Sequence, residues 1–182
     1  MGAVSGLDET ISVMFFGRGV PVAQWLTLLG EPQLALPLTA IVLAWLLGGA
    51  ELRRRAPAIL WSGALLLLLV QGTKTLVDRP RPGAQLAAVR SLPGGSLRRR
   101  ALPSGHSAQA AWAGGLIAAA SSGGPLIAVA ALGLAVSVGW SRLALGAHWF
   151  FDVLAGLFLG FGLAFAASKR QERERPDPES SR

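Results

Sequence analysis

Long uncharged apolar segments constrain the fold of this chain more than any other feature of its sequence. Residues 33–50 and 57–73 are rich in leucine, alanine and valine, and residues 107–141 contain no charged side chain. A last apolar stretch, residues 147–167, holds a single acid. About 20 apolar residues in a helix cross the ~30 Å hydrocarbon core of a bilayer, so these segments predict transmembrane helices. With a mean hydropathy of +0.48 and 15% charged residues, the chain is typical of a membrane protein and not of a two-layer soluble enzyme.

Short polar breaks between the apolar segments predict how the helices follow one another. The charged cluster at residues 51–55 ends the first helix, and Pro57 suits the first turn of the second. Residues 121–125, Ser-Ser-Gly-Gly-Pro, predict a tight turn that divides residues 107–141 into two antiparallel helices. The expected fold is therefore an all-α transmembrane helical bundle of about five spanning helices.

The two ends of the chain have a different character. Residues 1–30 are broken by Asp8, Glu9 and Arg18, which predicts an interfacial amphipathic helix rather than a spanning one. Residues 171–182 are polar, charged and contain two prolines, which predicts a disordered tail. The chain is thus expected to form one domain, residues 1–170, followed by this tail. Within the predicted helix of residues 147–167, we interpret Gly156 and Gly160 as internal packing positions, with dimerisation as the alternative.

Alternation of the helices places three polar segments on one side of the membrane. These segments are residues 74–81, 103–106 and 141–152, so both histidines lie on that side. The connection over residues 78–103 is long, and connections of this length are usually functional or disordered. Nine Lys and Arg residues fall on this side and eight on the other. If several arginines of the first side bind substrate, the remaining basic anchors favour a cytoplasmic location for residues 53–55 and the tail.

Cationic side chains in these polar segments predict a phosphate site. Lys74 offers a point charge, and Arg81 and Arg142 each offer a planar fork that can bind two phosphate oxygens. Ser104 is a good N-cap residue for the helix that follows, and Gly105 permits close approach of a ligand to the backbone. The free N–H groups and positive end of such a helix favour an anion.

The two histidines complete a catalytic arrangement. His148 and Asp152 are four residues apart, which would place them on one face of a helix. Asp152 would hold one ring nitrogen and stabilise the developing positive charge, while the other nitrogen attacks phosphorus. His106 remains free to protonate the leaving oxygen. Each residue alone has an ordinary interpretation as an interfacial or snorkelling side chain, and their occurrence on one side favours the catalytic one.

Composition excludes several other kinds of site. The chain has no cysteine, which excludes disulfides, thiolate nucleophiles and cysteine-ligated metals, and its two histidines are too few for a histidine-rich metal cage. We therefore expect no metal and no cofactor. The net charge of +7 is spread between apolar segments, which favours anionic lipid or phosphate over nucleic acid as a partner. The roles of Arg79, Arg90 and the arginines at 98–100 stay open.

The spacing of these residues resembles the type 2 phosphatidic acid phosphatase family, which is related to the vanadium haloperoxidases. Its signature has three parts in fixed order, and each has a match in this chain. Lys74, six residues and Arg81-Pro82 resemble the first part, and residues 103–106, Pro-Ser-Gly-His, resemble the second. Ser141-Arg142, five residues, His148, three residues and Asp152 resemble the third. Membrane members often have six spanning helices, and five can be placed here.

This resemblance implies a helical-bundle lipid phosphatase. It implies a phosphohistidine intermediate on His148, His106 as the general acid, and phosphoryl binding by Lys74, Arg81, Ser104, Gly105 and Arg142. The motif does not choose among phosphatidic acid, phosphatidylglycerol phosphate and polyprenyl diphosphate. The expected location is a bacterial inner membrane with the site on its outer face, and the oligomeric state stays open. A small anion or lipid transporter that uses the same cations is the alternative, although it does not need Asp152 after His148.

Overall fold

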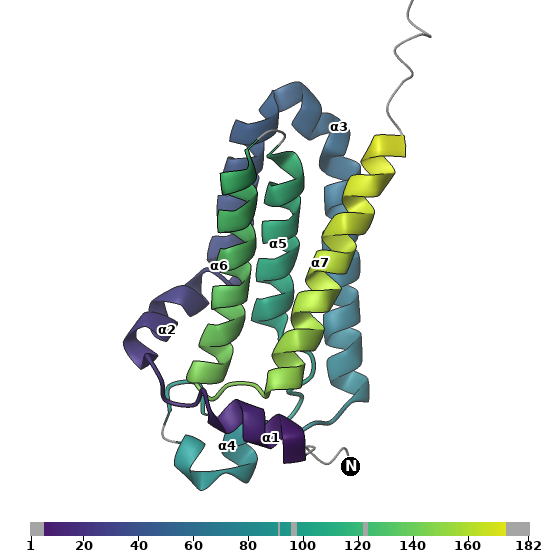
Figure 1. The fold of residues 1–182 in the computed structure, drawn as a ribbon. Coiled ribbons are helices and arrows are strands. Elements are labelled where there is room, and N and C mark those ends of the chain that lie inside the picture. The colour runs from purple at the N-terminus through teal and green to yellow at the C-terminus, as the bar shows by residue number, and fades with distance from the viewer. Residues whose placement is uncertain (1–5, 91, 96–97, 122–123, 174–182) are drawn as a thin grey trace, which may run out of the picture.

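The computed structural model describes residues 6–90, 92–95, 98–121 and 124–173, and every regular element in this part of the chain is a helix. The long helix α3 (Pro32–Leu76) folds back on itself as two legs. These legs run alongside α5 (Gly105–Ala120), α6 (Pro125–Ala144) and α7 (Phe150–Arg173) (Figure 1). The predicted all-α bundle is thereby confirmed, because the two legs of α3 and the three further helices correspond to the five expected helical segments.

Helix length and hydropathy agree with a membrane location. Three helices of the described residues, α3, α6 and α7, are long and apolar enough to cross a bilayer. The remaining helix of the bundle, α5, has 16 residues and packs against α3, α6 and α7. Because α5 is enclosed by protein on these sides, its small residues, alanine and glycine above all, suit close helix packing better than contact with lipid.

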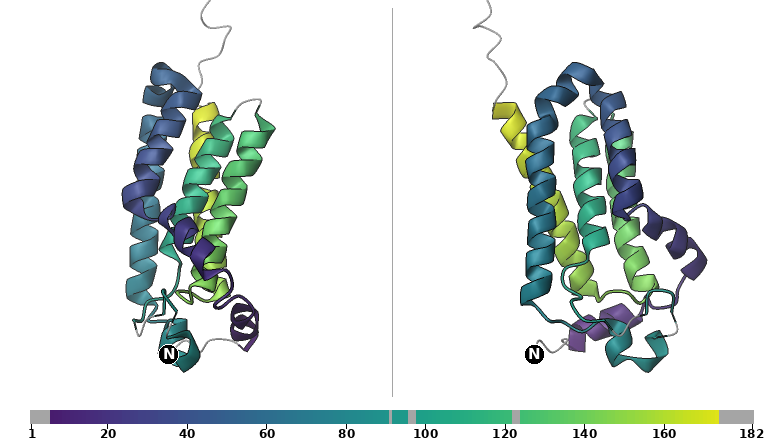
Figure 2. Two further views of the ribbon diagram at one scale, coloured as in Figure 1. Left: turned by 90° about the vertical axis from the view of Figure 1, so that its left-hand side faces the viewer. Right: turned by 180° about the vertical axis from the view of Figure 1, so that it is seen from behind.

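A bend at Gly48 joins two helices that the sequence pattern separates. Gly48 has a φ of 70° and a ψ of 166°, a left-handed conformation that a glycine adopts without strain. The charged cluster that was expected to end the first helix is itself helical, and within it Glu51 pairs with Arg54 at 2.6 Å and Arg55 at 2.5 Å, at i+3 and i+4. The arch formed by α3 is visible in Figure 2.

The N-terminal segment forms two short helices where one interfacial helix was expected. α1 (Gly6–Val13) and α2 (Val20–Leu28) are separated by Gly17 and Gly19, which have φ values of 76° and 60°. α1 packs against α7 and α2 against α6. The buried residues of α1 are Asp8 and Ser12, so α1 turns a polar face inward rather than an apolar one. α1 therefore packs onto the bundle through polar side chains, which an amphipathic membrane anchor would not do.

The close approach of α5 and α7 depends on the two glycines interpreted as packing positions. A Cβ at Gly160 would lie 2.1 Å from the main-chain oxygen of Ala108, and one at Gly156 would lie 2.5 Å from that of Ser104. Both distances are too short for any side chain, which confirms that interpretation. The crossing brings the start of α5 next to the start of α7.

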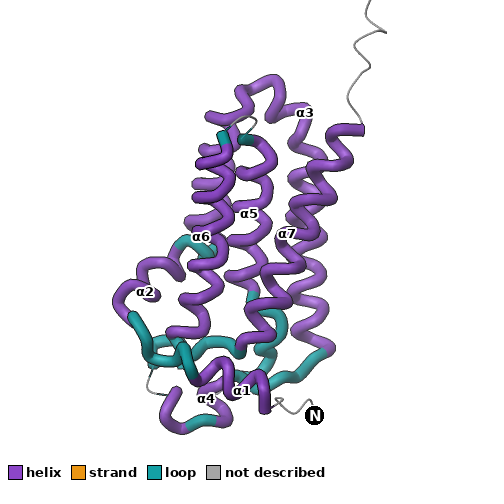
Figure 3. The backbone as a smooth tube through the Cα atoms, in the orientation of Figure 1, coloured by secondary structure: helices purple, strands orange, loops and turns teal. Residues whose placement is uncertain are grey.

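Most of the connecting segments gather at one end of the bundle, and the turn between α5 and α6 lies at the other (Figure 3). The long connection after α3 contains α4 (Pro82–Gln85) and the 3-10 helix η1 (Ala87–Val89), so its described part is folded. α7 continues to Arg173, three residues into the predicted disordered tail. The rest of that tail, residues 174–182, lies outside the described residues.

Candidate active site

The predicted site residues come from separate helix ends that meet at the loop end of the bundle. Lys74 lies in the last turn of α3 and Arg142 in the last turn of α6, while Arg81 immediately precedes α4. His106 lies in the first turn of α5 and Asp152 in the first turn of α7. Besides burial, the positive charges of Arg142, Arg81 and Lys74 lower the pKa of His148, as expected for cations near its ring.

The start of α5 is built to receive an anion. Ser104 is the N-cap residue, and its hydroxyl accepts the backbone N–H of Ser107 at 3.4 Å. A Cβ at Gly105 would lie 3.7 Å from the Nζ atom of Lys74, so the ammonium group lies beside the backbone of the first turn. Both the helix dipole and this lysine favour a negative charge there.

The two predicted phosphate-binding arginines carry unpaired buried donors. The Nε atoms of Arg81 and Arg142 are buried and have no hydrogen-bond partner among the described residues. Arg142 is held by its Nη1 group, which donates to the hydroxyl of Thr27 at 2.5 Å. Buried guanidinium donors are costly without acceptors, and a phosphoryl group supplies several acceptor oxygens.

His148 is buried in the link between α6 and α7. Its relative exposure is 2%, and its Nδ1 atom lies 3.7 Å from Oδ2 of Asp152. The expectation that both residues share a helix face was wrong, because α7 begins at Phe150, after His148. Burial, with the nearby charge of Arg142, lowers the pKa of His148 well below its usual value of 6.5. The imidazole is therefore neutral near pH 7, as a nucleophile must be.

Asp152 is fixed from two directions. Its Oδ2 accepts the backbone N–H of Trp149 at 2.9 Å, which caps the start of α7. Its Oδ1 accepts a hydrogen bond from Nη1 of Arg79 at 2.6 Å. The main-chain oxygen of Asp152 accepts the N–H of Ser104 at 2.9 Å, which joins the anion-binding turn to the carboxylate. The carboxylate position beside His148 is thus set by α5, α7 and the loop together.

Contacts from α1 were missed by the sequence analysis. Nη2 of Arg79 donates to Oδ2 of Asp8, so one guanidinium bridges Asp8 and Asp152. The sequence left the role of Arg79 open, and Asp8 was interpreted only as an interruption of an apolar stretch. Nothing local distinguishes Asp8 from Glu9, which follows it, and its partner is 71 residues away.

A second carboxylate lies next to His106. Oε1 of Glu31 is 2.9 Å from Nε2 of His106. The chain approaches closely here, since a Cβ at Gly30 would lie 3.0 Å from Cβ of His106. Glu31 was used in the sequence analysis only as a boundary of the first spanning segment, and nothing local in the sequence connects it with a histidine 75 residues away.

The other loop arginines have partners outside this cluster. Arg90 donates to the main-chain oxygen of Gly83 at 3.2 Å, and Arg99 pairs with Asp78 at 2.5 Å. The main-chain oxygen of Arg98 accepts the N–H of Arg81 at 3.3 Å. The side chains of Arg90 and Arg99 therefore hold the loop together rather than add donors to the site, while the charge of Arg98 acts on Arg81.

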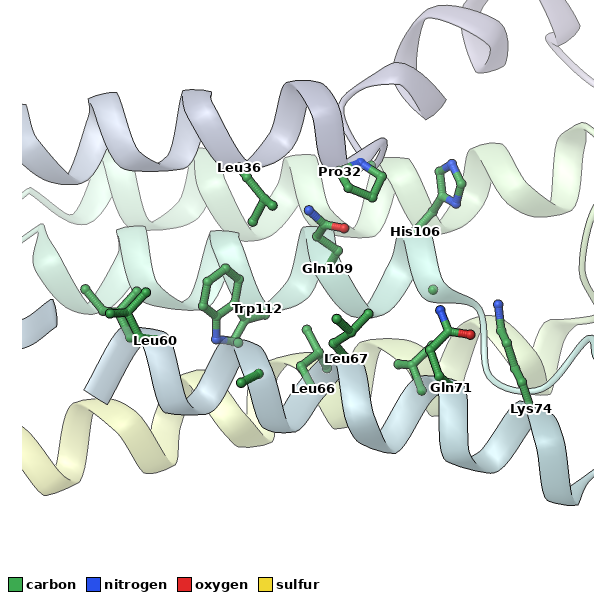
Figure 4. Close-up of a pocket in the computed structure, with 16 residues that line it drawn as sticks. Pro32, Leu36, Leu60, Leu66, Leu67, Gln71, Lys74, His106, Gln109 and Trp112 are labelled. Atoms are coloured by element: carbon green, nitrogen blue, oxygen red, sulfur yellow. The ribbon is translucent and has the colours of Figure 1, made fainter. Parts of the chain in front are cut away.

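An apolar cavity of about 510 Å³ opens beside the cationic cluster. It lies between the legs of α3 and the side of α5, and Figure 4 shows Lys74 and His106 at one of its ends. Most of its wall is apolar and is formed by residues such as Leu36, Leu60, Leu66, Leu67 and Val70. Two amides, Gln71 and Gln109, line it close to the charged end.

Comparison with known protein families agrees with this geometry. The model of the PAP2 superfamily matches residues 55–176. The chain belongs to this superfamily. The matched region contains every predicted site residue, so the family resemblance drawn from the three motifs is confirmed. It excludes the N-terminal segment that supplies Asp8, Thr27 and Glu31 to the PAP2 site.

Two solved structures resemble the whole PAP2 fold of this chain. One is the crystal structure of Aquifex aeolicus LpxE, with 21% identity, a TM-score of 0.72, and coverage of 91% of this chain and 96% of that one. The other is the first transmembrane PAP2 type phosphatidylglycerolphosphate phosphatase from Bacillus subtilis, with 30% identity, a TM-score of 0.65, and coverage of 96% and 89%. A search of curated protein sequences gave no match.

Proposed function

We propose that this PAP2 protein is an integral-membrane lipid phosphatase that hydrolyses a phosphomonoester or diphosphate on a lipid. The observation that carries the proposal is the apolar cavity that meets the cationic cluster at Lys74 and His106. A phosphorylated lipid has two matching parts: a dianionic head group for the cationic cluster and an apolar chain for the cavity. The Bacillus subtilis relative, a phosphatidylglycerolphosphate phosphatase at 30% identity, supports the same class of reaction.

The first chemical step is attack by His148 on phosphorus. Lys74, Arg81, Arg142, the hydroxyl of Ser104 and the N–H group of Gly105 bind the phosphoryl oxygens and stabilise the charge of the transition state. The neutral ring of His148 forms the new P–N bond through Nε2, since Nδ1 faces Asp152. His106 starts as an imidazolium, a charge that Glu31 and the bound phosphoryl dianion favour. As the P–O bond to the lipid breaks, this imidazolium gives its proton to the leaving oxygen and becomes neutral. Asp152 stabilises the positive charge that develops on the imidazole.

The second step returns the enzyme to its starting state. Water attacks phosphorus, the P–N bond breaks, and His106 now accepts a proton from that water. The electron pair of the P–N bond returns to His148, and phosphate leaves the cationic cluster. The cycle needs no redox partner or organic cofactor.

Phosphate release from a panel of purified lipids tests the proposed reaction and its substrate together. The panel contains phosphatidic acid, phosphatidylglycerol phosphate and a polyprenyl diphosphate in detergent micelles, with a His148→Ala variant as the control. We expect release by the wild type from at least one lipid and none above background by the variant. A wild type that releases phosphate from none, but carries anions or lipids across proteoliposome membranes, would instead favour the transporter alternative.

Metal independence is part of the proposal and gives a direct prediction. The positive charge around the phosphoryl group comes from Lys74, Arg81 and Arg142, which would repel a metal cation at the same place. Activity is expected to persist in excess chelator and to fall with vanadate, which mimics five-coordinate phosphorus. Initial rates of phosphate release are the measurement. Loss in chelator that Mg²⁺ restores would contradict the prediction.

We also propose that the site faces the outer side of a bacterial inner membrane. The natural absence of cysteine permits a test with single introduced thiols, at exposed Gln85 on the loop end and exposed Ala50 at the α3 bend. An impermeant maleimide is expected to label Gln85→Cys in intact cells and Ala50→Cys only after lysis. The reverse pattern would place the site in the cytoplasm. Each variant is first checked for wild-type phosphate release.

A further inference from the structure

The buried polar face of α1 contacts the first residues of α7. The backbone N–H of Phe151 donates to Oδ1 of Asp8 at 3.0 Å, and that of Phe150 donates to the hydroxyl of Ser12 at 2.8 Å. Asp8 and Ser12 are both completely buried. A helix start leaves unpaired N–H groups, and α1 satisfies two of them from outside the helix. One helix of the N-terminal segment thus anchors the helix that carries Asp152.

Asp8 differs from Ser12 because it also reaches the catalytic carboxylate through Arg79. The Arg79 side chain is 12% exposed, and its guanidinium lies between the completely buried side chains of Asp8 and Asp152. Its Nη1 binds Asp152 and its Nη2 binds Asp8, so the fork is held at both tips. The ring nitrogen of Trp149 donates to the main-chain oxygen of Pro80 at 2.9 Å, which fixes the loop beside Arg79 to the start of α7.

The charges of this trio bear on the chemistry of His148. One guanidinium faces two carboxylates, so the trio carries a net negative charge when both acids are ionised. Without the charge of Asp8, Arg79 would neutralise Asp152 alone and weaken its attraction for an imidazole that becomes positive. Charges this close interact strongly in a buried site, where solvent screens little.

We propose that Asp8 is a positioning residue of the active site. Through Arg79 it fixes the position of the Asp152 carboxylate and preserves the negative charge of that carboxylate beside His148. The inference rests on the proposed phosphohistidine reaction. It makes α1, which lies outside the matched family region, a working part of the catalytic apparatus. Asp8 itself contacts the Arg79 side chain and the backbone of α7.

The test compares Asp8→Asn with Ser12→Ala, which alters the same helix without touching Arg79. Asparagine preserves the shape of Asp8 and can still accept a hydrogen bond from Phe151. In Asp8→Asn we expect the rate of phosphoenzyme formation, measured by rapid quench, to fall by roughly ten- to a hundredfold, as is typical of outer-shell partners. KM should stay nearly unchanged, because no phosphate ligand is lost. Ser12→Ala should lower the thermal unfolding temperature but leave that rate near the wild-type value.

A double variant separates the proposed role from simple packing. In an Asp152→Asn background, Asp8→Asn is expected to add little further loss, because the group on which Asp8 acts has already lost its charge. Arg79→Lys keeps the positive charge but not the fork, and it should reproduce the rate loss of Asp8→Asn. Arg79→Lys also replaces Asp8→Asn as the decisive variant if the latter does not fold.

The outcomes distinguish this inference from the proposed function. If the wild type releases phosphate and Asp8→Asn forms phosphoenzyme at the wild-type rate, the role of Asp8 is overturned while the phosphatase reaction stands. The same holds if the losses in Asp8→Asn and Asp152→Asn multiply in the double variant, or if Ser12→Ala loses as much activity as Asp8→Asn. A wild type that releases no phosphate from any lipid overturns the proposed function, and this inference with it.

Discussion

Replacement of His148 by alanine is expected to abolish turnover, with a loss of roughly 10⁴-fold or more in kcat. The variant lacks the imidazole nitrogen that forms the P–N bond, and no other nucleophile of the described residues takes its position. The cationic cluster of Lys74, Arg81 and Arg142 is unchanged, so substrate should still bind. Acid-labile label from a ³²P-phosphorylated substrate, measured after a base quench, should be absent from this variant. Label that survives in His148→Ala would refute the assignment of the nucleophile.

His106→Ala provides the matched comparison, since it removes the only other histidine of the chain. Loss of a general acid is expected to cost about 10²- to 10⁴-fold with a lipid leaving group. A substrate with a good leaving group, such as a nitrophenyl phosphate, needs no proton at the leaving oxygen, so this variant should still form labelled phosphoenzyme from it. Equal loss on both kinds of substrate would contradict the role of His106 as the acid.

Asp152→Asn is the second variant for which we expect a very large effect. The amide retains the shape of the side chain but removes the negative charge and can present an N–H group to Arg79 or to Trp149. By comparison with the carboxylate of Ser-His-Asp triads, formation of the phosphohistidine should slow by about 10⁴-fold. Phosphate affinity should change little, because the carboxylate repels an anion and the cations remain. Rapid-quench kinetics and KM on the same lipid are the measurements.

Arg142→Ala is the control that separates charge stabilisation from substrate binding. It removes a phosphate ligand, so KM should rise while kcat falls, with a combined loss of about ten- to a hundredfold in kcat/KM. Asp152→Asn should lower kcat alone. A folded and inserted Asp152→Asn with near-normal kcat would show that its place beside His148 is a packing feature, and the nucleophile would lose its main support.

Much of the fold was predictable because it depends on short-range patterns. Apolar length predicted the rods of the bundle, and Ser104 predicted the start of α5, since an N-cap acts within one turn. The pattern failed where a charged cluster was taken as the end of a helix. Glu51 instead pairs with Arg54 and Arg55 inside α3, and the bend lies at Gly48, whose conformation no hydrophobic pattern reveals.

The phosphate-binding and catalytic residues could be proposed from spacing, but their geometry could not. The spacing of four from His148 to Asp152 suggested a shared helix face, whereas His148 lies in the link before α7 and its Nδ1 atom approaches Oδ2 of Asp152 only to 3.7 Å, without a hydrogen bond. Asp152 caps its own helix instead, through Trp149. The structure brings the predicted residues to one end of the bundle, while the local structure that joins His148 to Asp152 differs from the prediction.

The sequence by itself determined that the chain forms an all-α membrane bundle and that its polar helix ends lie together. Those features follow from burial of apolar segments in lipid and from residues within a turn or two of each other. Only the tertiary structure decided which charges support the catalytic groups: Asp8 meets Arg79 across 71 residues, Arg79 meets Asp152 across 73, and Glu31 meets His106 across 75. Such pairs depend on how α1, the α2–α3 junction and the loop after α3 pack onto α5 and α7, and packing of distant segments leaves no periodic or local trace in the chain.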